Sequence, residues 1–351
     1  PEMKYSRWQC RSTAMLSTVL PCTTAVDSAS FFKLLTIIGI LFLLMVTGYI
    51  CRKIGWIDEV SSKKLSKLII CLGQPMMIVG ALLSKDFGWE LLREGLFYTA
   101  IGFIIHPVMA FFAFLSGKAY KDLNERKISE FATIFTNCGF IGFPILEAVF
   151  PGKGAFYGAF FVIGFHLYIW TLGILILSQG REDIRLTPKK ALINFGTVPC
   201  AIGLILYLCK SFAPDVLLGN TSVITRFCNY LGDLCMPISV LVTGSLLATQ
   251  SFGKLLRNPR LYYFNIIKLL VVPLCVCLLT KLVTLGMEDS YSTILFCTVI
   301  AALPSAATVT MLSEMYGIDS GFAAQTVGSS SVLSLGTLPL LYFLGDLIAR
   351  I

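Results

Sequence analysis

Charged residues are scarce in this sequence. Asp, Glu, Lys and Arg make up 14% of its 351 residues, whereas they account for about a quarter of a soluble globular protein. Hydrophobic residues make up 56%, and the mean hydropathy is +0.79. At about 20 apolar residues per transmembrane helix, this composition excludes a soluble globule and predicts a membrane protein that crosses the bilayer about ten times.

Sequence motifs of catalysis and metal binding are also absent. The chain has two histidines and no HExxH, GxGD or GxSxG motif, so few residues could act as a general base or a nucleophile. It has twelve cysteines but no CxxC pair, and cysteines in apolar segments usually pack as small hydrophobic side chains. We therefore expect neither an enzyme, nor a metal site, nor a resident cofactor.

The basic residues are dispersed between the apolar stretches. The formal net charge is +8, but no single patch concentrates it, so nucleic-acid binding is not expected. Residues 1–30 are polar and rich in Ser and Thr, and they lack the apolar core of a signal peptide. We interpret them as a polar tail, with Met15 as an alternative start of the chain.

Apolar stretches of 20 or more residues alternate with short polar loops from Phe31 onward. Because unpaired backbone groups are costly in lipid, each span must be helical, and the fold class is an all-α integral membrane protein. The predicted spans are residues 31–52, 62–84, 92–115, 128–148, 155–177, 189–210, 222–248, 261–284, 291–313 and 321–347.

Lys and Arg residues indicate how these spans are oriented, since short loops rich in them stay on the cytoplasmic side. Sixteen lie in or beside the odd-numbered loops and six in the even-numbered loops. The odd loops are therefore predicted to be cytoplasmic. This places both termini on the extracytoplasmic side of a multi-pass protein of the cell membrane.

Prolines recur at nearly the same offset in the two halves of the chain. Pro75 in the second span precedes Pro237 in the seventh by 162 positions, and Pro144 in the fourth precedes Pro304 in the ninth by 160. This repetition indicates a duplication, and five spans per half would give the halves opposite orientations, as in many secondary transporters. The predicted units are two inverted five-helix repeats, residues 31–177 and 189–351, and a cytoplasmic linker, residues 178–188.

Proline and glycine interrupt the fourth and ninth spans. Proline removes a backbone hydrogen bond from a helix, and Gly139, Gly142 and Pro144 lie within six residues of one another. Pro304 is followed by small residues, beginning with Ser305, that let segments approach closely. We predict that helices 4 and 9 break and cross here, with Pro144 and Pro304 starting the second half of each helix.

Two half-helix N-termini that meet would form an anion site. Each carries about half a positive charge and several unpaired N–H groups, which could hold a carboxylate without a buried Arg or Lys. The alternative is that the prolines only kink packed helices. The residues predicted to surround the substrate are Thr136, Asn137, Gly139, Gly142, Pro144, Pro304, Ser305, Gln74 and His166.

Polar residues inside the other spans are costly and are therefore candidates for function. Asp233, four residues before Pro237, is expected near the bilayer centre, where it could carry H+ or bind Na+ as the coupling ion. A hydrogen-bonded structural role is the alternative for Asp233, as packing is for His166. Lys268 is expected to extend its amine to the membrane surface, and Ser330 and its neighbouring serines are expected to pack helices together.

Three segments resemble those of the auxin efflux carrier family, which includes plant PIN carriers and bacterial malate-permease-like proteins. They are residues 48–75, the run TNCGFIGFP that ends at Pro144, and the block ALPSAATVT around Pro304. The resemblance extends over about residues 31–347. It implies ten helices in two inverted repeats, a scaffold and a mobile transport domain, and elevator-type transport of organic anions bound near Asn137.

The sequence departs from both branches of that family. Bacterial members usually have Asn near the position of His166 and small residues where Asp233 stands, and the Asp233 block is closer to the plant carriers. Plant carriers, however, have a long central loop, whereas only Gln179 to Pro188 separates the halves here. The short linker favours the compact bacterial type, so auxin is not the expected substrate.

The favoured function is a secondary active carrier of small organic anions such as carboxylates, with the substrate and the lipid bilayer as its partners. One alternative is a cation/proton antiporter on the same scaffold, although such proteins usually carry adjacent intramembrane carboxylates. Another is a lipid- or sterol-sensing module that does not transport, although such modules usually accompany further domains. The substrate, the direction, the coupling ion and the oligomeric state stay open, with a homodimer as one option.

Overall fold

The computed structural model describes residues 28–351 except 184–186, 213–214, 250–256 and 288–289. Within this part the secondary structure is helical, and the only extended pairing is one isolated bridge. The all-α prediction is confirmed for these residues. Most of the predicted polar tail lies outside the described residues.

The described residues of the first half of the chain form ten helical elements. They are α2 (Ser28–Lys53), α3 (Glu59–Leu68), η1 (Ile69–Gly73), α4 (Gln74–Leu83), α5 (Trp89–Gly117), α6 (Leu123–Ile134), α7 (Gly142–Val149), α8 (Gly154–Tyr168), η2 (Ile169–Gly173) and α9 (Ile174–Ser178).

The second half continues in the same way over its described residues. Its elements are α10 (Pro188–Leu192), α11 (Thr197–Cys209), α12 (Asp215–Leu218), α13 (Val223–Gly232), α14 (Cys235–Thr249), α16 (Pro259–Ile266), η3 (Ile267–Val271), α17 (Val272–Val283), α18 (Ser290–Ala302), α19 (Thr308–Met315) and α20 (Ser320–Arg350).

Seven helical segments of the described chain are long and apolar enough to cross a membrane. They coincide with seven of the ten predicted spans. The other three correspond to the shorter helix α11 and to the interrupted helices α6–α7 and α18–α19. The chain is therefore a multi-pass membrane protein.

Three of the long helices contain a π-helical turn among their described residues, η1, η2 and η3. Such turns are often found at functional sites. Each one adjoins or contains a polar residue singled out from the sequence. Gln74 directly follows η1, His166 lies three residues before η2, and Lys268 is within η3.

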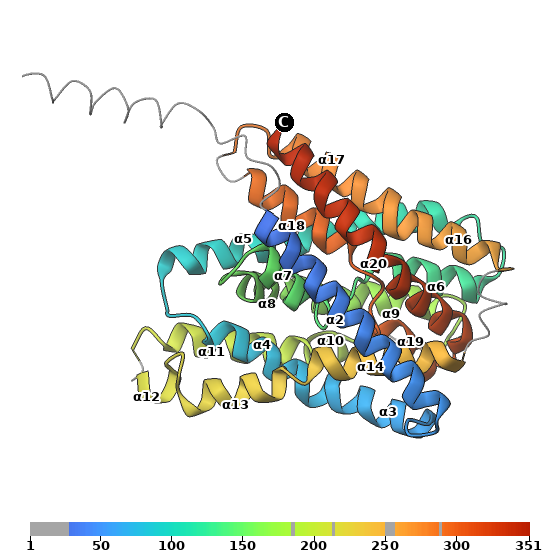
Figure 1. Cartoon of the computed structure of the whole chain (residues 1–351), viewed down its shortest axis with the longest axis horizontal. Coiled ribbons are helices and arrows are strands. Elements are labelled where there is room, and N and C mark those ends of the chain that lie inside the picture. Colours follow the sequence, from blue (N-terminus) through green and yellow to red (C-terminus); the bar gives the residue numbers. More distant parts are fainter. Residues whose placement is uncertain (1–27, 184–186, 213–214, 250–256, 288–289) are drawn as a thin grey trace, which may run out of the picture.

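The helices form two groups that lie on opposite sides of the molecule in Figure 1. In one group, α4 packs against α11 and α13, and α14 packs against α2. In the other, α18 packs against α17 and α20, while α5 packs against α6 and α8. The half-helices α7 and α19 belong to the second group, and α7 also contacts α2.

The contact between α2 and α14 depends on two glycines that face it. A Cβ atom added to Gly48 would lie 2.0 Å from the carbonyl oxygen of Leu241, and one added to Gly244 would lie 2.0 Å from the carbonyl oxygen of Met45. Small residues permit this close approach of two helix backbones. The two helices therefore have no room for a larger residue at either position.

We predict that Gly244→Ala forces α2 and α14 apart and destabilises the protein by about 1–3 kcal/mol, as overpacking does. Thermal unfolding of the purified protein in detergent would measure the effect. The matched control is Gly39→Ala in the same helix pair, because nothing lies within 4 Å of a Cβ atom added there. Equal melting temperatures for the two variants would contradict the prediction.

Candidate functional site

Two interrupted helices meet in the interior of the protein. α6 ends at Ile134 and α7 begins at Gly142, while residues 303–307 separate α18 from α19. Thr136 and Ser305 pair as an antiparallel bridge. The two interrupted segments, residues 135–141 and 303–307, therefore lie side by side, and we call them the crossover.

Backbone hydrogen bonds join the two strands of the crossover. The N–H of Asn137 donates to the carbonyl oxygen of Pro304 over 2.8 Å, and the N–H of Ala306 donates to that of Phe135 over 2.9 Å. An unpaired backbone group in lipid is costly. Each broken helix thus supplies partners for the backbone groups that the other helix leaves unpaired.

Ser305 adds side-chain bonds to the same junction. Its hydroxyl donates to the carbonyl oxygen of Ala132 over 2.9 Å, and its N–H donates to Oγ of Ser330 on α20 over 3.2 Å. Both serines are fully buried. Ser330 therefore supports the crossover from a third helix, which agrees with the packing role expected for the serines of the last span.

The prolines do not occupy the positions predicted for them. Pro144 is the third residue of α7 rather than its first, and Pro304 lies inside the crossover, four residues before α19 begins. Any of the first helical positions can accept proline, because the N–H groups there have no partner within the helix. The exact helix start is set instead by the pairing between the two strands of the crossover.

The glycines at the break are explained by the lack of room for a side chain and not by an unusual backbone conformation. Neither Gly139 nor Gly142 has a positive φ angle. A Cβ atom on Gly142 would lie 3.0 Å from Cδ1 of Leu303 on the opposite strand, a tight contact, whereas one on Gly139 would meet only ordinary contacts. Gly142 thus lets the two strands approach each other.

The N–H groups at the start of α7 already have partners. Gly142 donates to the carbonyl oxygen of Asn137 over 2.9 Å, and Phe143 donates to that of Gly139 over 3.5 Å, while Pro144 has no N–H. The prediction of several unpaired donors at this half-helix is therefore wrong. The dipole of the half-helix remains, but a ligand there would need further donors or a formal positive charge.

A buried polar pair adjoins the crossover. Nε2 of Gln74 lies 3.2 Å from Nε2 of His166, and both side chains are about 5% exposed or less. Gln74 is next to the crossover, because a Cβ atom on Gly139 would lie 3.4 Å from its amide nitrogen. If the amide donates, the histidine proton is on Nδ1, which has no hydrogen-bond partner among the described residues.

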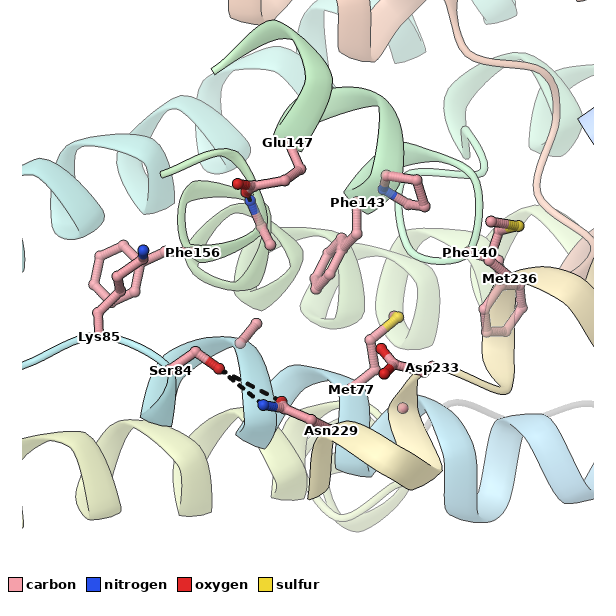
Figure 2. Close-up of a pocket in the computed structure, with 14 residues that line it drawn as sticks. Met77, Ser84, Lys85, Phe140, Phe143, Glu147, Phe156, Asn229, Asp233 and Met236 are labelled. Atoms are coloured by element: carbon pink, nitrogen blue, oxygen red, sulfur yellow. Dashed lines mark hydrogen bonds between the residues drawn. The ribbon is translucent and has the colours of Figure 1, made fainter. Parts of the chain in front are cut away.

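A first cavity, of about 420 Å³, reaches the crossover from the side of α13. We call it the Asp233 cavity. Figure 2 shows Phe143 and Glu147 of α7 on one wall and Asn229 and Asp233 on the other. Asp233 follows the last residue of α13, at the interruption between α13 and α14, and its side chain is exposed to this cavity rather than packed against the crossover.

A second cavity, of about 710 Å³, reaches the crossover from the opposite end of α14. We call it the Lys67 cavity. Arg52, Lys63 and Lys67 line it together with one acidic residue, Glu59, which forms an exposed ion pair with Lys63. The wall also includes Thr310 of α19. Basic residues thus predominate in the Lys67 cavity, whereas Asp233, Glu147 and one lysine, Lys85, line the other cavity.

An apolar cluster lies between the two cavities. Its buried members are Ile69, Ile70, Phe140 and Cys235, and the residues packed against them are Met77, Ile238, Ala307 and Met311. Phe140 and Met77 line the Asp233 cavity, whereas Ile70, Ala307 and Met311 line the Lys67 cavity. We call this cluster the apolar barrier.

Lys268 is the residue whose position the sequence misjudged most. It is expected at the membrane surface, but its side chain is 0% exposed, and its Nζ donates to the carbonyl oxygen of Ala301 over 3.2 Å. One signal was available, since the lysine lies in the middle of the apolar run from Ile266 to Val272. A lysine this far from both ends of a span cannot easily reach the surface.

We predict that Gly196→Ala destabilises the protein by displacing His166, because a Cβ atom at Gly196 would lie 2.0 Å from Nδ1 of the ring. The loss should be about 1–3 kcal/mol, measured by thermal unfolding. The same change in a His166→Ala background should cost much less, because the clashing ring is gone. Additive effects of the two substitutions would show that they do not interact.

The comparisons with known proteins agree with this architecture. The family model described as membrane transport protein matches residues 34–342. An uncharacterized transporter from Methanocaldococcus jannaschii is 23% identical over 307 residues, which cover 85% of this chain and 94% of the relative. An uncharacterized transporter from Methanothermobacter thermautotrophicus is 22% identical over 308 residues, which cover 87% and 96%. The chain therefore belongs to the membrane transport protein family, the auxin efflux carrier family that its motifs resemble.

Proposed function

We propose that this protein is a secondary active carrier of small organic anions, such as carboxylates, that bind beside the crossover. The observation that carries the proposal is the pairing of two broken helices next to a buried polar pair, with a cavity on each side. Transporters commonly build substrate sites from discontinuous helices near the bilayer midplane. Family membership supports transport as the activity.

Equivalent packing pairs support two inverted five-helix repeats. The contact of α2 with α14, which joins the two halves, corresponds to that of α11 with α4, and the contact of α5 with α6 in the first half corresponds to that of α17 with α18 in the second. Likewise α7 packs against α8 as α19 packs against α20. We assign residues 31–177 and 189–351 to the repeats and residues 178–188 to the linker.

The two helix groups fit an elevator mechanism. The group with α2, α4, α11, α13 and α14 would be the scaffold, and the group with α5 to α9 and α16 to α20 would carry the substrate. Both cavities and the apolar barrier lie where these groups meet, since their walls combine α4, α13 or α14 with α7 or α19. Movement of one group along the other would expose the crossover first to one side of the membrane and then to the other.

The substrate site would combine side chains from three spans. Asn137 and Thr136 belong to the crossover, and Gln74 reaches it from the end of η1. The backbone N–H groups at the start of α7 already donate to crossover carbonyls. Side-chain amides would therefore provide the hydrogen bonds to a carboxylate. His166 would hold Gln74 in place through the 3.2 Å contact.

A cation/proton antiporter is the second candidate, because Asp233 and Glu147 line the same cavity. Adjacent carboxylates in a membrane protein can carry protons or bind cations. The carboxylate of Glu147, however, accepts bonds from the N–H groups of Gly152 and Ala155 at the start of α8. Only Asp233 would then exchange ions, which favours a coupling role for it over a dedicated cation pathway.

We predict that purified protein in lipid vesicles takes up labelled small carboxylates and that Asn137→Ala lowers the uptake at least tenfold. The expected reason is the loss of one amide that holds the carboxylate, worth about 1.5–3 kcal/mol for a bond to a charged group. Asn124→Ala, an exposed position in α6, is the matched control. Normal uptake by Asn137→Ala would refute the site, cation exchange without anion flux would indicate the antiporter, and no flux at all would indicate a sensor.

We also predict that Asp233→Asn removes the dependence of uptake on a proton or sodium gradient but leaves uptake down the gradient of the anion itself. An ionised Asp near a bound anion repels it, so a proton or cation should accompany the anion. Uptake would be measured with each gradient imposed separately. Asp215→Asn, exposed in α12, is the control, and an unchanged ion dependence in Asp233→Asn would remove the coupling role.

A further inference from the structure

Lys268 places a cationic side chain at the edge of the crossover. It lies in the π turn η3 and is completely buried. Its Nζ donates to the carbonyl oxygen of Ala301 in the last turn of α18, three residues before Pro304.

No carboxylate neutralises Lys268 within the part of the chain that the structure describes. The ion pairs found there do not include it. The buried acidic residues Glu130 and Asp346 are paired with arginines one turn away on their own helices.

A buried ammonium group needs compensation for the loss of its hydration. The C-terminal end of α18 supplies some of it, since a helix C-terminus carries about half a negative charge and the carbonyl of Ala301 belongs to this end. One of the three N–H donors of the ammonium group is used in that bond. Among the described residues, no acidic side chain pairs with the other two donors.

The tip of α7 offers few free donors to an anion. The N–H groups of Gly142 and Phe143 there are bonded to crossover carbonyls. Gln74 approaches the crossover at Gly139, and Lys268 approaches it through Ala301, three residues before Pro304. The N–H of Asn137 donates to the carbonyl oxygen of Pro304 and joins these two strands, and in a medium of low dielectric a charge acts over longer distances than in water.

We propose that Lys268 is the positive charge that selects the transported substrate, and that a bound monoanion beside Gln74 neutralises it. This inference rests on the proposed function and deepens it by naming the substrate class. Lys268 acts as a specificity-determining residue through its field, and it need not touch the substrate. A neutral analogue of the same shape gains nothing from this field, and a dianion brings one negative charge too many.

The test compares Lys268→Gln, Lys268→Met and Lys268→Arg with the wild-type protein. Gln can still donate to the carbonyl of Ala301 but has no charge, Met has neither property, and Arg keeps the charge. The control is Lys281→Met, in the last turn of α17 of the same span. The probes are lactate as monoanion, succinate as dianion and lactamide as neutral analogue, with binding measured by thermal shift and transport by uptake into vesicles.

We expect the affinity for lactate to fall at least tenfold in Lys268→Gln and Lys268→Met, and to stay within about threefold of wild type in Lys268→Arg and Lys281→Met. Any binding of lactamide should be the same in all variants. Lactate affinity in Lys268→Gln equal to wild type would overturn the proposal and leave the carrier function intact. A wild-type protein that neither binds nor carries any of a panel of carboxylates would overturn the proposed function and this inference together.

If Lys268→Met does not fold, Lys268→Gln decides the question, because its amide keeps a hydrogen-bond donor for the carbonyl of Ala301. A purely structural role of the lysine would reduce the melting temperature of both variants without changing the ratio of lactate to succinate affinity. That ratio is therefore measured for each variant that elutes as a single species. An unchanged ratio in Lys268→Gln would overturn the proposal.

Discussion

Backbone pairing between two broken helices is the interaction on which the rest of this structure depends. A helix that stops inside a membrane leaves N–H and C=O groups without partners, and lipid supplies none. Here the segment after α6 and the segment after α18 satisfy each other through the Thr136–Ser305 bridge and its neighbouring bonds. Neither break could exist alone at acceptable cost, so the two must be kept in register. The packing of Gly142 against Leu303 and the support of Ser305 by Ser330 serve this requirement.

The crossover also determines what kind of ligand the protein can hold. Satisfying the α7 donors internally stabilises the break but leaves fewer N–H groups for a substrate. The polar chemistry of the site is consequently transferred to side chains on neighbouring spans, each at or near a π turn, namely Gln74, His166 and Lys268. A widened turn changes the direction of the residues that follow it, and each of these three buried side chains lies at or near such a turn.

The sequence predicted the helices far better than it predicted the site. Long apolar runs specify where a chain enters and leaves lipid, so seven of the predicted spans coincide with long apolar helices, and proline with glycine correctly indicated the two breaks. The sixth span agrees less well, since α11 begins at Thr197 rather than near residue 189. The start of each half-helix was wrong, because tertiary pairing rather than Pro144 or Pro304 sets it. The depth of Lys268 was missed for a related reason: hydropathy gives the length of a span but not which neighbours cover each face. The contact between Gln74 and His166 could not be predicted from the sequence either, because the two residues lie 92 positions apart.

The apolar barrier has a consequence for the membrane itself. Among the described residues, Ile70, Phe140, Met77 and their neighbours lie between the two cavities, and apolar constrictions of this kind oppose the passage of water and ions. A carrier needs such a barrier in each conformation, because a continuous wet path would let protons and salts dissipate the electrochemical gradient across the membrane.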